Sequence, residues 1–206
     1  MYKVLVIGDY AVGKTSIIKR YCEGFFTPNY KLTVGVDFAV KDIQIENSVV
    51  TLQLWDVAGH ERFGNMTRVY YKYAIAAVVV YDLSRPATFE AVLKWRDDVH
   101  SKVILRNNEP VPLILLANKC DLPGVNVDTK ELDEFCAANG FKKWFQTSAQ
   151  NNTNIDEAMM YLMKMILEVS KTNRPEGPPP DHIQIELQPP STYHDDSVDI
   201  VQNCCN

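Results

Sequence analysis

The chain has 206 residues, 46% of them hydrophobic, which suits one α/β domain of ordinary size together with a tail. Its net charge of −5 is unevenly placed, because residues 1–172 carry 20 acidic and 20 basic residues, and this neutral body argues against nucleic-acid binding. No apolar run approaches the ~20 residues of a membrane-spanning helix, and the N-terminus passes into a predicted strand without a signal sequence. We therefore expect any membrane attachment to be added chemically.

The cysteines indicate a reducing environment. Five of them occur along the chain without the spacing of metal ligands. Their odd number gives no complete disulfide framework, so the cytosol is the expected compartment. They are Cys22, Cys120, Cys136, Cys204 and Cys205.

The first functional motif is the run GDYAVGKT at residues 8–15, which fits the phosphate-loop pattern G-x-x-x-x-G-K-[ST] without a mismatch. Gly8 and Gly13 permit backbone angles at which successive amide N–H groups turn toward one anion. Lys14 adds a positive charge, and the Thr15 hydroxyl is a hard oxygen ligand suited to Mg2+. The residues predicted to hold nucleotide phosphates are Tyr10, Ala11, Val12, Gly13, Lys14, Thr15 and Ser16.

The residues on either side of this loop support the interpretation. Residues 4–7 form an apolar run typical of a strand buried on both faces. Residues 16–21 predict a helix whose N-terminal dipole points at the anion. The alternative is an ordinary strand, turn and helix that happens to contain two glycines, and the agreement of loop and context favours the phosphate site.

Further runs divide the rest of the chain. Residues 36–46 and 49–56, separated by Asn-Ser, predict an antiparallel hairpin at a sheet edge. The apolar runs 74–81 and 111–117 are typical of central parallel strands, and 144–147 predicts a short last strand. Helices are predicted at residues 88–101, 128–139 and 154–170.

The first hairpin run breaks its own alternation. Phe38 and Val40 share one parity, whereas Ile43 and Ile45 take the other. Since a period of two places alternate residues on opposite faces of a sheet, we expect a bulge or a twist near Asp42.

Strands that alternate with helices predict the fold class. Residues 1–172 are expected to form an α/β domain of the P-loop NTPase type. Its sheet is doubly wound, mostly parallel and six-stranded, with one antiparallel edge strand and about five flanking helices. Ligands of such folds bind beyond the carboxyl ends of the strands.

A second motif, WDVAG at residues 55–59, follows the phosphate loop in the chain. Asp56 ends a predicted strand, where it can reach Mg2+ through water, and Gly59 can present a backbone N–H to a terminal phosphate. An aspartate at a strand end is common, so the weight of this motif comes from its place after a phosphate loop.

A third motif concerns the base. Asn118, Lys119 and Asp121 follow the strand predicted at 111–117, and a carboxylate there can accept both N–H donors of a guanine edge, which adenine does not offer. Asp121 could otherwise be a turn residue. However, the run Thr-Ser-Ala at 147–149 offers a backbone N–H for the guanine carbonyl oxygen at the next strand end. Asp121 and the run at 147–149 together favour GTP over ATP.

On these motifs the sequence resembles the Ras superfamily of small GTPases over residues 2–170, and within it the Rab family. GDYAVGKTS, TVGVDF, WDVAGHERF, NKCD and TSA occur in family order and near family spacing. The resemblance implies that Phe26 stacks on the guanine and that Thr33 senses the third phosphate and ligates Mg2+. The segments around Thr33 and Gly59 then become two switches that the triphosphate orders. The base loop implied by TSA is Ser148, Ala149 and Gln150.

The resemblance also implies an effector surface. Phe38, Trp55 and Tyr70 look like the aromatic triad on which Rab effectors read the switch state, although they could simply be core aromatics. Within the Rabs, GNMTRVYYK, RPATFEAVLKW, LLANKCD and NIDEA look like the branch that serves melanosomes and other lysosome-related organelles.

Three residues depart from the family pattern. His60 stands where the family usually carries the glutamine that orients the attacking water, so we expect slow GTP hydrolysis. Tyr10 occupies a phosphate-loop position that is small in Ras. Gln150 replaces a usual lysine, which bears on packing against the base.

Residues 173–206 form the predicted tail. They hold six of the eleven prolines, six acidic residues and one arginine, which predicts a disordered linker. The chain ends Cys204-Cys205-Asn206, which is no C-a-a-X box, whereas paired terminal cysteines resemble the double geranylgeranylation site of Rabs. Two lipid chains give stable anchoring, and the acidic linker should add no attraction to anionic lipids.

The resemblance therefore implies a monomeric GTP/GDP switch on the cytoplasmic face of endosome-, lysosome- or phagosome-like membranes, cycling with the cytosol. Its implied partners are an exchange factor, a GTPase-activating protein, a GDP-dissociation inhibitor and effectors. One alternative is an ATP-using P-loop kinase or ATPase, against which Asp121 argues. The other is a GTP-bound binding module that scarcely hydrolyses its nucleotide because of His60.

Overall fold

A computed structural model describes residues 1–29, 31–45, 48–59 and 67–172. They form a six-stranded sheet with the strand order β2-β3-β1-β4-β5-β6. The β2–β3 pair is antiparallel and the other four pairs of this sheet are parallel, which confirms the predicted fold class. The strands are β1 (Tyr2–Ile7), β2 (Val36–Ile45), β3 (Ser48–Val57), β4 (Ala74–Asp82), β5 (Leu113–Asn118) and β6 (Phe141–Thr147).

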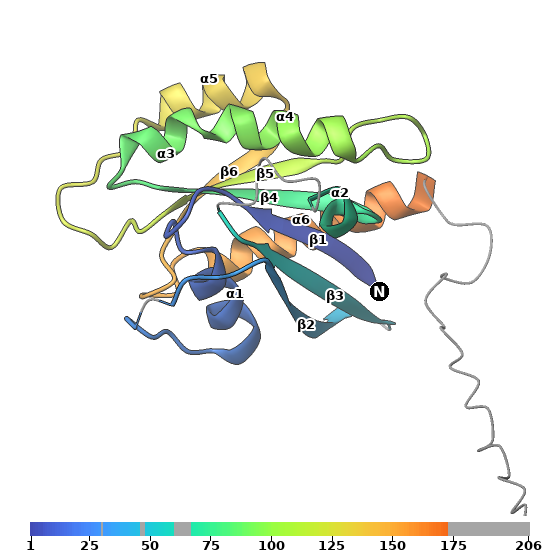
Figure 1. The fold of residues 1–206 in the computed structure, drawn as a ribbon, viewed down its shortest axis with the longest axis horizontal. Helices are drawn as coiled ribbons and strands as arrows, with labels where there is room; N and C mark the ends of the chain where they lie inside the picture. Colours follow the sequence, from blue (N-terminus) through green and yellow to red (C-terminus); the bar gives the residue numbers. More distant parts are fainter. Residues whose placement is uncertain (30, 46–47, 60–66, 173–206) are drawn as a thin grey trace, which may run out of the picture. The chain divides into compact units, whose positions relative to one another are not determined.

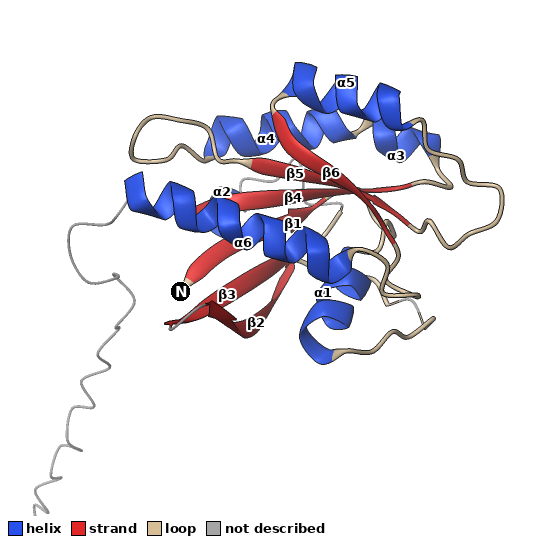
Figure 2. Cartoon of the chain, turned by 180° about the vertical axis from the view of Figure 1, so that it is seen from behind, coloured by secondary structure: helices blue, strands red, loops and turns tan. Residues whose placement is uncertain are grey.

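Helices cover both faces of the sheet (Figure 1). On one face lie α1 (Lys14–Glu23) and α6 (Ile155–Thr172), which the view from behind brings forward (Figure 2). On the other face lie α3 (Pro86–Glu90), α4 (Val92–Lys102) and α5 (Thr129–Asn139), and the short α2 (Thr67–Tyr71) precedes β4. Each face has its own hydrophobic cluster, and the central strands contribute to both. This two-sided burial explains why β1, β4 and β5 are almost continuously apolar.

Local signals set the helix ends. Asp128 caps α5, because its Oδ1 accepts from the Glu131 backbone N–H at 3.0 Å, and Gly140 ends it in the left-handed region at φ 76°. The helix predicted at 88–101 instead starts at Pro86 and is divided into α3 and α4. Pro86 suits a first helical turn, since its missing N–H would be unpaired there.

The predicted bulge near Asp42 is wrong. All ten residues of β2 pair with β3 without a shift of register. The two parities instead mark two different faces, because Ile43 is buried in the cluster beneath α1 and α6 while Phe38 and Val40 are 56% and 50% exposed. An apolar outer face, rather than an irregular backbone, therefore breaks the alternation.

Two predictions about membranes concern the absence of a spanning helix and the lipid-modified tail. Within the four described ranges, no helix is both long and apolar enough to cross a bilayer. The predicted tail, residues 173–206 with Cys204 and Cys205, lies outside the described residues. Its boundary with the folded domain stays a prediction.

Candidate nucleotide site

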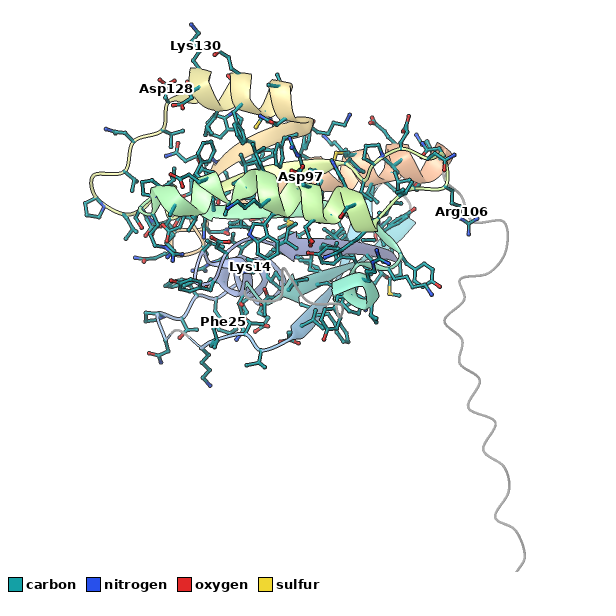
Figure 3. The ribbon with its side chains drawn as sticks, turned by 45° about the horizontal axis from the view of Figure 1, so that its top comes forward. Lys14, Phe25, Asp97, Arg106, Asp128 and Lys130 are labelled. Atoms are coloured by element: carbon teal, nitrogen blue, oxygen red, sulfur yellow. The ribbon has the colours of Figure 1, made fainter. Side chains whose placement is uncertain are left out.

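A cavity of ≈ 540 Å³ opens at the sheet edge formed by the carboxyl ends of the parallel strands, and residues that follow β1, β5 and β6 line it. This volume falls in the range of ~300–1,000 Å³ typical of small-molecule sites. Lys14 from α1 and Phe25 from the loop after it both line the cavity (Figure 3). The cavity lies at the edge of the sheet that doubly wound folds use for ligands.

The phosphate loop holds Lys14 at one end of the cavity. The Lys14 side chain is 5% exposed, and its Nζ donates to the backbone carbonyls of Gly8 and Asp9, each at 2.8 Å. Burial lowers the pKa of Lys14 to about 8, although the carboxylates of Asp56 and Asp9 oppose this shift. An ammonium group has three donors, so one remains to meet an anion.

Glycines let three segments approach this end closely. Gly13 has φ +101°, and a Cβ added there would lie 2.3 Å from the Asn118 Nδ2. A Cβ on Gly59 would lie 2.2 Å from the Tyr10 backbone nitrogen. Since real Cβ atoms do not approach other atoms so closely, both positions require glycine, and Gly59 is held against the phosphate loop.

Two hydroxyls and one carboxylate gather beside Lys14. The Thr15 and Thr33 Oγ1 atoms are 3.0 Å apart, Thr15 donates to the Asp56 Oδ2, and Thr33 donates to the same oxygen at 3.4 Å. Asp56 is 3% exposed, and burial raises the pKa of its carboxyl despite the hydrogen bond from Thr15.

This cluster fits a magnesium ion. The buried Asp56 Oδ1 has no hydrogen-bond partner in the part of the chain that the structure describes, which is costly for a carboxylate oxygen. Hard oxygens are the ligands that Mg2+ prefers, and all three side chains supply them. A divalent cation would give the Asp56 Oδ1 the partner that no hydrogen bond from the described residues supplies.

The other end of the cavity is built from the ends of β5 and β6. The Ser148 Oγ donates to the Asp121 Oδ1 at 2.6 Å, which fixes the carboxylate. The Asn118 Nδ2 donates to the Val12 carbonyl at 2.8 Å, and Thr147 donates to the Asn118 Oδ1 at 3.3 Å. These bonds join the two strand ends to each other and to the phosphate loop.

The structure brings most of the predicted site residues to this one cavity. Val12, Asp56 and Ser148 do not line it, but each is hydrogen-bonded to a residue that does. His60 lies outside the described residues. The predicted residues that line the cavity are Tyr10, Ala11, Gly13, Lys14, Thr15, Ser16, Phe26, Thr33, Gly59, Asn118, Lys119, Asp121, Ala149 and Gln150.

Sequence reasoning missed several lining residues, most of which lie in the loop after α1. For those in the loop, the signal was an aperiodic run between the α1 cap at Gly24 and Thr33, which contains the pair Phe25-Phe26. The missed residues are Lys19, Phe25, Thr27, Pro28, Asn29, Lys31, Leu32 and Leu122.

The three aromatics of the predicted effector surface lie on β2, β3 and α2. Phe38 stacks on Trp55 with ring centroids 5.8 Å apart, and Lys3 Nζ lies 3.4 Å from the centroid of Trp55. Trp55 and Tyr70 are half-buried against the core cluster beneath α4, whereas Phe38 is exposed. The group is thus partly core and partly surface.

Comparison with known proteins gives the class. A protein-family model described as the Ras family matches residues 3–168, so the chain belongs to the Ras family of small GTPases. The Dictyostelium discoideum protein Ras-related protein Rab-32B is 61% identical over 206 residues, covering 100% of this chain and 77% of the relative. Human Ras-related protein Rab-32 is 55% identical over 172 residues, covering 81% and 75%. Human Ras-related protein Rab-7L1 is 48% identical over 171 residues, covering 82% and 84%.

These relatives place the chain within the Rabs. It is a Rab GTPase of vesicle trafficking, and members of this family bind GTP or GDP with Mg2+ and act through regulators and effectors. The comparisons thus favour a hydrolysing GTPase over a binding module with negligible hydrolysis.

Proposed function

We propose that this cavity holds GTP or GDP and that the chain uses it to direct trafficking at endosome- and lysosome-related membranes. The observation that carries the proposal is the pairing of two chemically different ends in one cavity. One end has a buried lysine beside two hydroxyls and a carboxylate, and the other has a carboxylate fixed by a serine.

At the phosphate end, Lys14 would meet the phosphate oxygens together with backbone N–H groups of residues 10–16. Thr15 and Thr33 would hold Mg2+ directly, and Asp56 would hold it through water. When bound, the ion offsets the phosphate charge. Gly59, which lies against Tyr10, would donate its backbone N–H to the third phosphate when GTP is bound.

At the base end, Asp121 would accept from the two N–H donors of guanine while Ala149 donates its backbone N–H to the base oxygen. Asn118, Lys119 and Gln150 line the same end, and Phe26 would supply a ring to stack on the base. Chromatography of the nucleotide released from the purified protein tests this assignment directly. Guanine nucleotide is the expected result, and adenine nucleotide would contradict it.

We further propose slow intrinsic hydrolysis. A glutamine amide can accept from the attacking water and donate to the phosphate together, whereas the rigid imidazole of His60 has a different reach. Tyr10 is 51% exposed at the cavity wall, where it would crowd an incoming arginine.

Single-turnover hydrolysis by His60→Gln, at full GTP loading and matched Mg2+, should be ~10-fold or more faster than by the parent, about 1.4 kcal/mol of barrier. The unchanged chain at the same loading is the control. An unchanged or slower rate would show that His60 already positions the water.

Membrane attachment through geranylgeranyl groups on Cys204 and Cys205 completes the proposal. Two prenyl chains are enough for stable anchoring. Changing both cysteines to serine should move the protein from the membrane pellet to the supernatant of cell lysates without altering nucleotide binding. Continued pelleting would refute the lipid anchor.

A further inference from the structure

Arg20, in the last turn of α1, connects segments that are far apart in the sequence. Each of its three guanidinium nitrogens donates a hydrogen bond to a different backbone carbonyl. Nε donates to Ala149 O at 2.8 Å, one terminal nitrogen donates to Gly24 O at 2.8 Å, and the other donates to Gln150 O at 2.9 Å. Two of these partners lie 129 and 130 residues from Arg20.

The loop that Arg20 holds belongs to the base end of the cavity. Ala149 and Gln150 both line the cavity, and Ala149 is 4% exposed. Just outside them, Ser148 and Thr153 form an isolated β-bridge with bonds of 3.2 Å and 3.0 Å. Residues 149–150 therefore lie within a closed loop whose ends are paired. The carbonyls of both residues accept hydrogen bonds from Arg20.

The Ala149 carbonyl needs a donor. Ala149 is buried, whereas Gln150 is exposed and its carbonyl is open to water. A buried backbone carbonyl without a partner costs roughly 1–3 kcal/mol, and neither strand nor helix supplies a donor at this turn. A guanidinium suits the task, because its planar fork can reach several acceptors at fixed angles, whereas the single ammonium of lysine cannot. If Arg20 were removed, the loop would be expected to turn the Ala149 carbonyl toward another donor.

We propose that Arg20 is a positioning residue for guanine recognition. By holding the carbonyls of Ala149 and Gln150, it keeps the Ala149 backbone N–H aimed at the carbonyl oxygen of the base. Its third bond, to Gly24, ties the same unit to the start of the loop that carries Phe25 and Phe26. This inference rests on the proposed guanine-nucleotide function and adds a residue that does not itself touch the nucleotide.

The proposal predicts an effect confined to the base end. Arg20→Met keeps an apolar stem of similar length and loses all three donors. GDP should leave this variant ~10-fold faster than the parent, and GTP should leave faster by the same factor, because the phosphate contacts are unchanged. The dissociation rates of Arg20→Lys should lie between those of the parent and those of Arg20→Met.

A base analogue separates positioning from general loosening. The 5′-diphosphate of 2-aminopurine riboside keeps the amino group that Asp121 would accept from but lacks the N1–H donor and the carbonyl oxygen that Ala149 would meet. The missing N1–H affects the parent and the variant alike, so it cancels when the two are compared. Arg20→Met should change its dissociation less than 2-fold. The preference of the protein for GDP over this analogue should therefore shrink by ~5-fold or more.

Arg96 provides a matched control. It is also half-buried, and it donates to a backbone carbonyl at a helix end, that of Asn139 at 3.3 Å, as well as to the Asn139 side chain at 2.9 Å. It does not line the cavity. Arg96→Met should leave GDP dissociation within 2-fold of the parent.

The outcomes are distinguishable. GDP dissociation from Arg20→Met at the parental rate would overturn the proposal, and so would equal acceleration of GDP and the analogue. If Arg20→Met does not fold, the same comparison in Arg20→Lys distinguishes these outcomes. Failure of the proposed function would appear instead in the parent chain, as absence of GDP binding.

Discussion

The two ends of the cavity are stabilised in different ways. At the base end, polar groups find their partners within the protein, because Ser148 donates to Asp121 while Asn118 donates to the Val12 carbonyl and accepts from Thr147. At the phosphate end, burial opposes the charge on both ionisable groups, lowering the pKa of Lys14 to about 8 and raising that of Asp56. The protein thus preorganises the base end, whereas the phosphate end would be completed by an anion and a cation.

This difference assigns distinct tasks to the ends. A preorganised set of acceptors and donors discriminates between bases, because a wrong base leaves buried polar groups unpaired. Buried charges that lack a full set of partners gain much more from a ligand that supplies them. Affinity should therefore come mainly from the phosphate end, and selectivity from the base end.

The largest expected effect is at the phosphate end. Lys14→Met removes the buried ammonium that would meet the phosphate oxygens, and loss of one partner of a buried charge pair costs ~2–5 kcal/mol. GDP and GTP affinity should each fall ~1,000-fold, measured by equilibrium titration with Mg2+ present.

Lys94→Met is the control for this prediction, since Lys94 is exposed on α4 and does not line the cavity. A loss of less than ~10-fold in Lys14→Met, with Lys94→Met unchanged, would place the affinity elsewhere and remove the contrast between the two ends.

A smaller and more selective effect is expected at the base end. Ser148→Ala removes the 2.6 Å hydrogen bond to Asp121, and a hydrogen bond to a charged group contributes ~1.5–3 kcal/mol. GDP affinity should fall ~10-fold. IDP lacks the amino group that Asp121 would accept from, so its affinity should fall less.

Competition titrations with GDP and IDP measure this difference. Ser170→Ala is the control, because Ser170 donates to the Leu167 carbonyl at 2.9 Å within α6 and does not line the cavity. Equal losses of GDP and IDP affinity in Ser148→Ala would mean that Ser148 supports the loop rather than orienting Asp121.

The sequence predicted the parts of the site whose chemistry is local. The phosphate loop and Asp121 each combine a fixed spacing with a residue type that the ligand requires, so they could be recognised without knowing their surroundings. The parallel strands could be predicted equally well, because a strand buried on both faces has an unbroken apolar sequence. Element ends were predicted less closely, as at residues 144–147, where β6 begins at Phe141.

Other features depend on contacts that no local pattern contains. The change of parity between Phe38 or Val40 and Ile43 was interpreted as a bulge or a twist, because a sequence does not distinguish a buried apolar face from an exposed one. The contacts of Arg20 join positions about 130 residues apart and use backbone carbonyls as acceptors. Since every residue type has a backbone carbonyl, the sequence does not indicate which residues accept from Arg20.

One polar group joins the two ends. Asp82 is 1% exposed at the end of β4 and forms ion pairs with Lys119 at 2.6 Å and with Arg85 at 2.9 Å. Burial by itself would raise the pKa of Asp82, but hydrogen bonds from Lys119, Ser84 and Arg85 lower it. Arg85 also donates to the Tyr10 carbonyl at 2.8 Å, so a chain of contacts runs from the base motif to the phosphate loop.

Breaking this link should give the smallest effect. Arg85→Met releases the Tyr10 carbonyl, but Asp82 keeps Lys119 and Ser84, so no buried charge is left unpaired. GDP and GTP affinity should both fall ~3-fold, about 0.6 kcal/mol, with Arg96→Met unchanged in the same titrations. Because Arg85 contacts the loop backbone rather than the reacting phosphate, single-turnover hydrolysis should stay within 2-fold of the parent. A larger loss for GTP than for GDP would mean that Arg85 acts on the third phosphate, and the two ends would then be coupled through catalysis rather than through the shape of the loop.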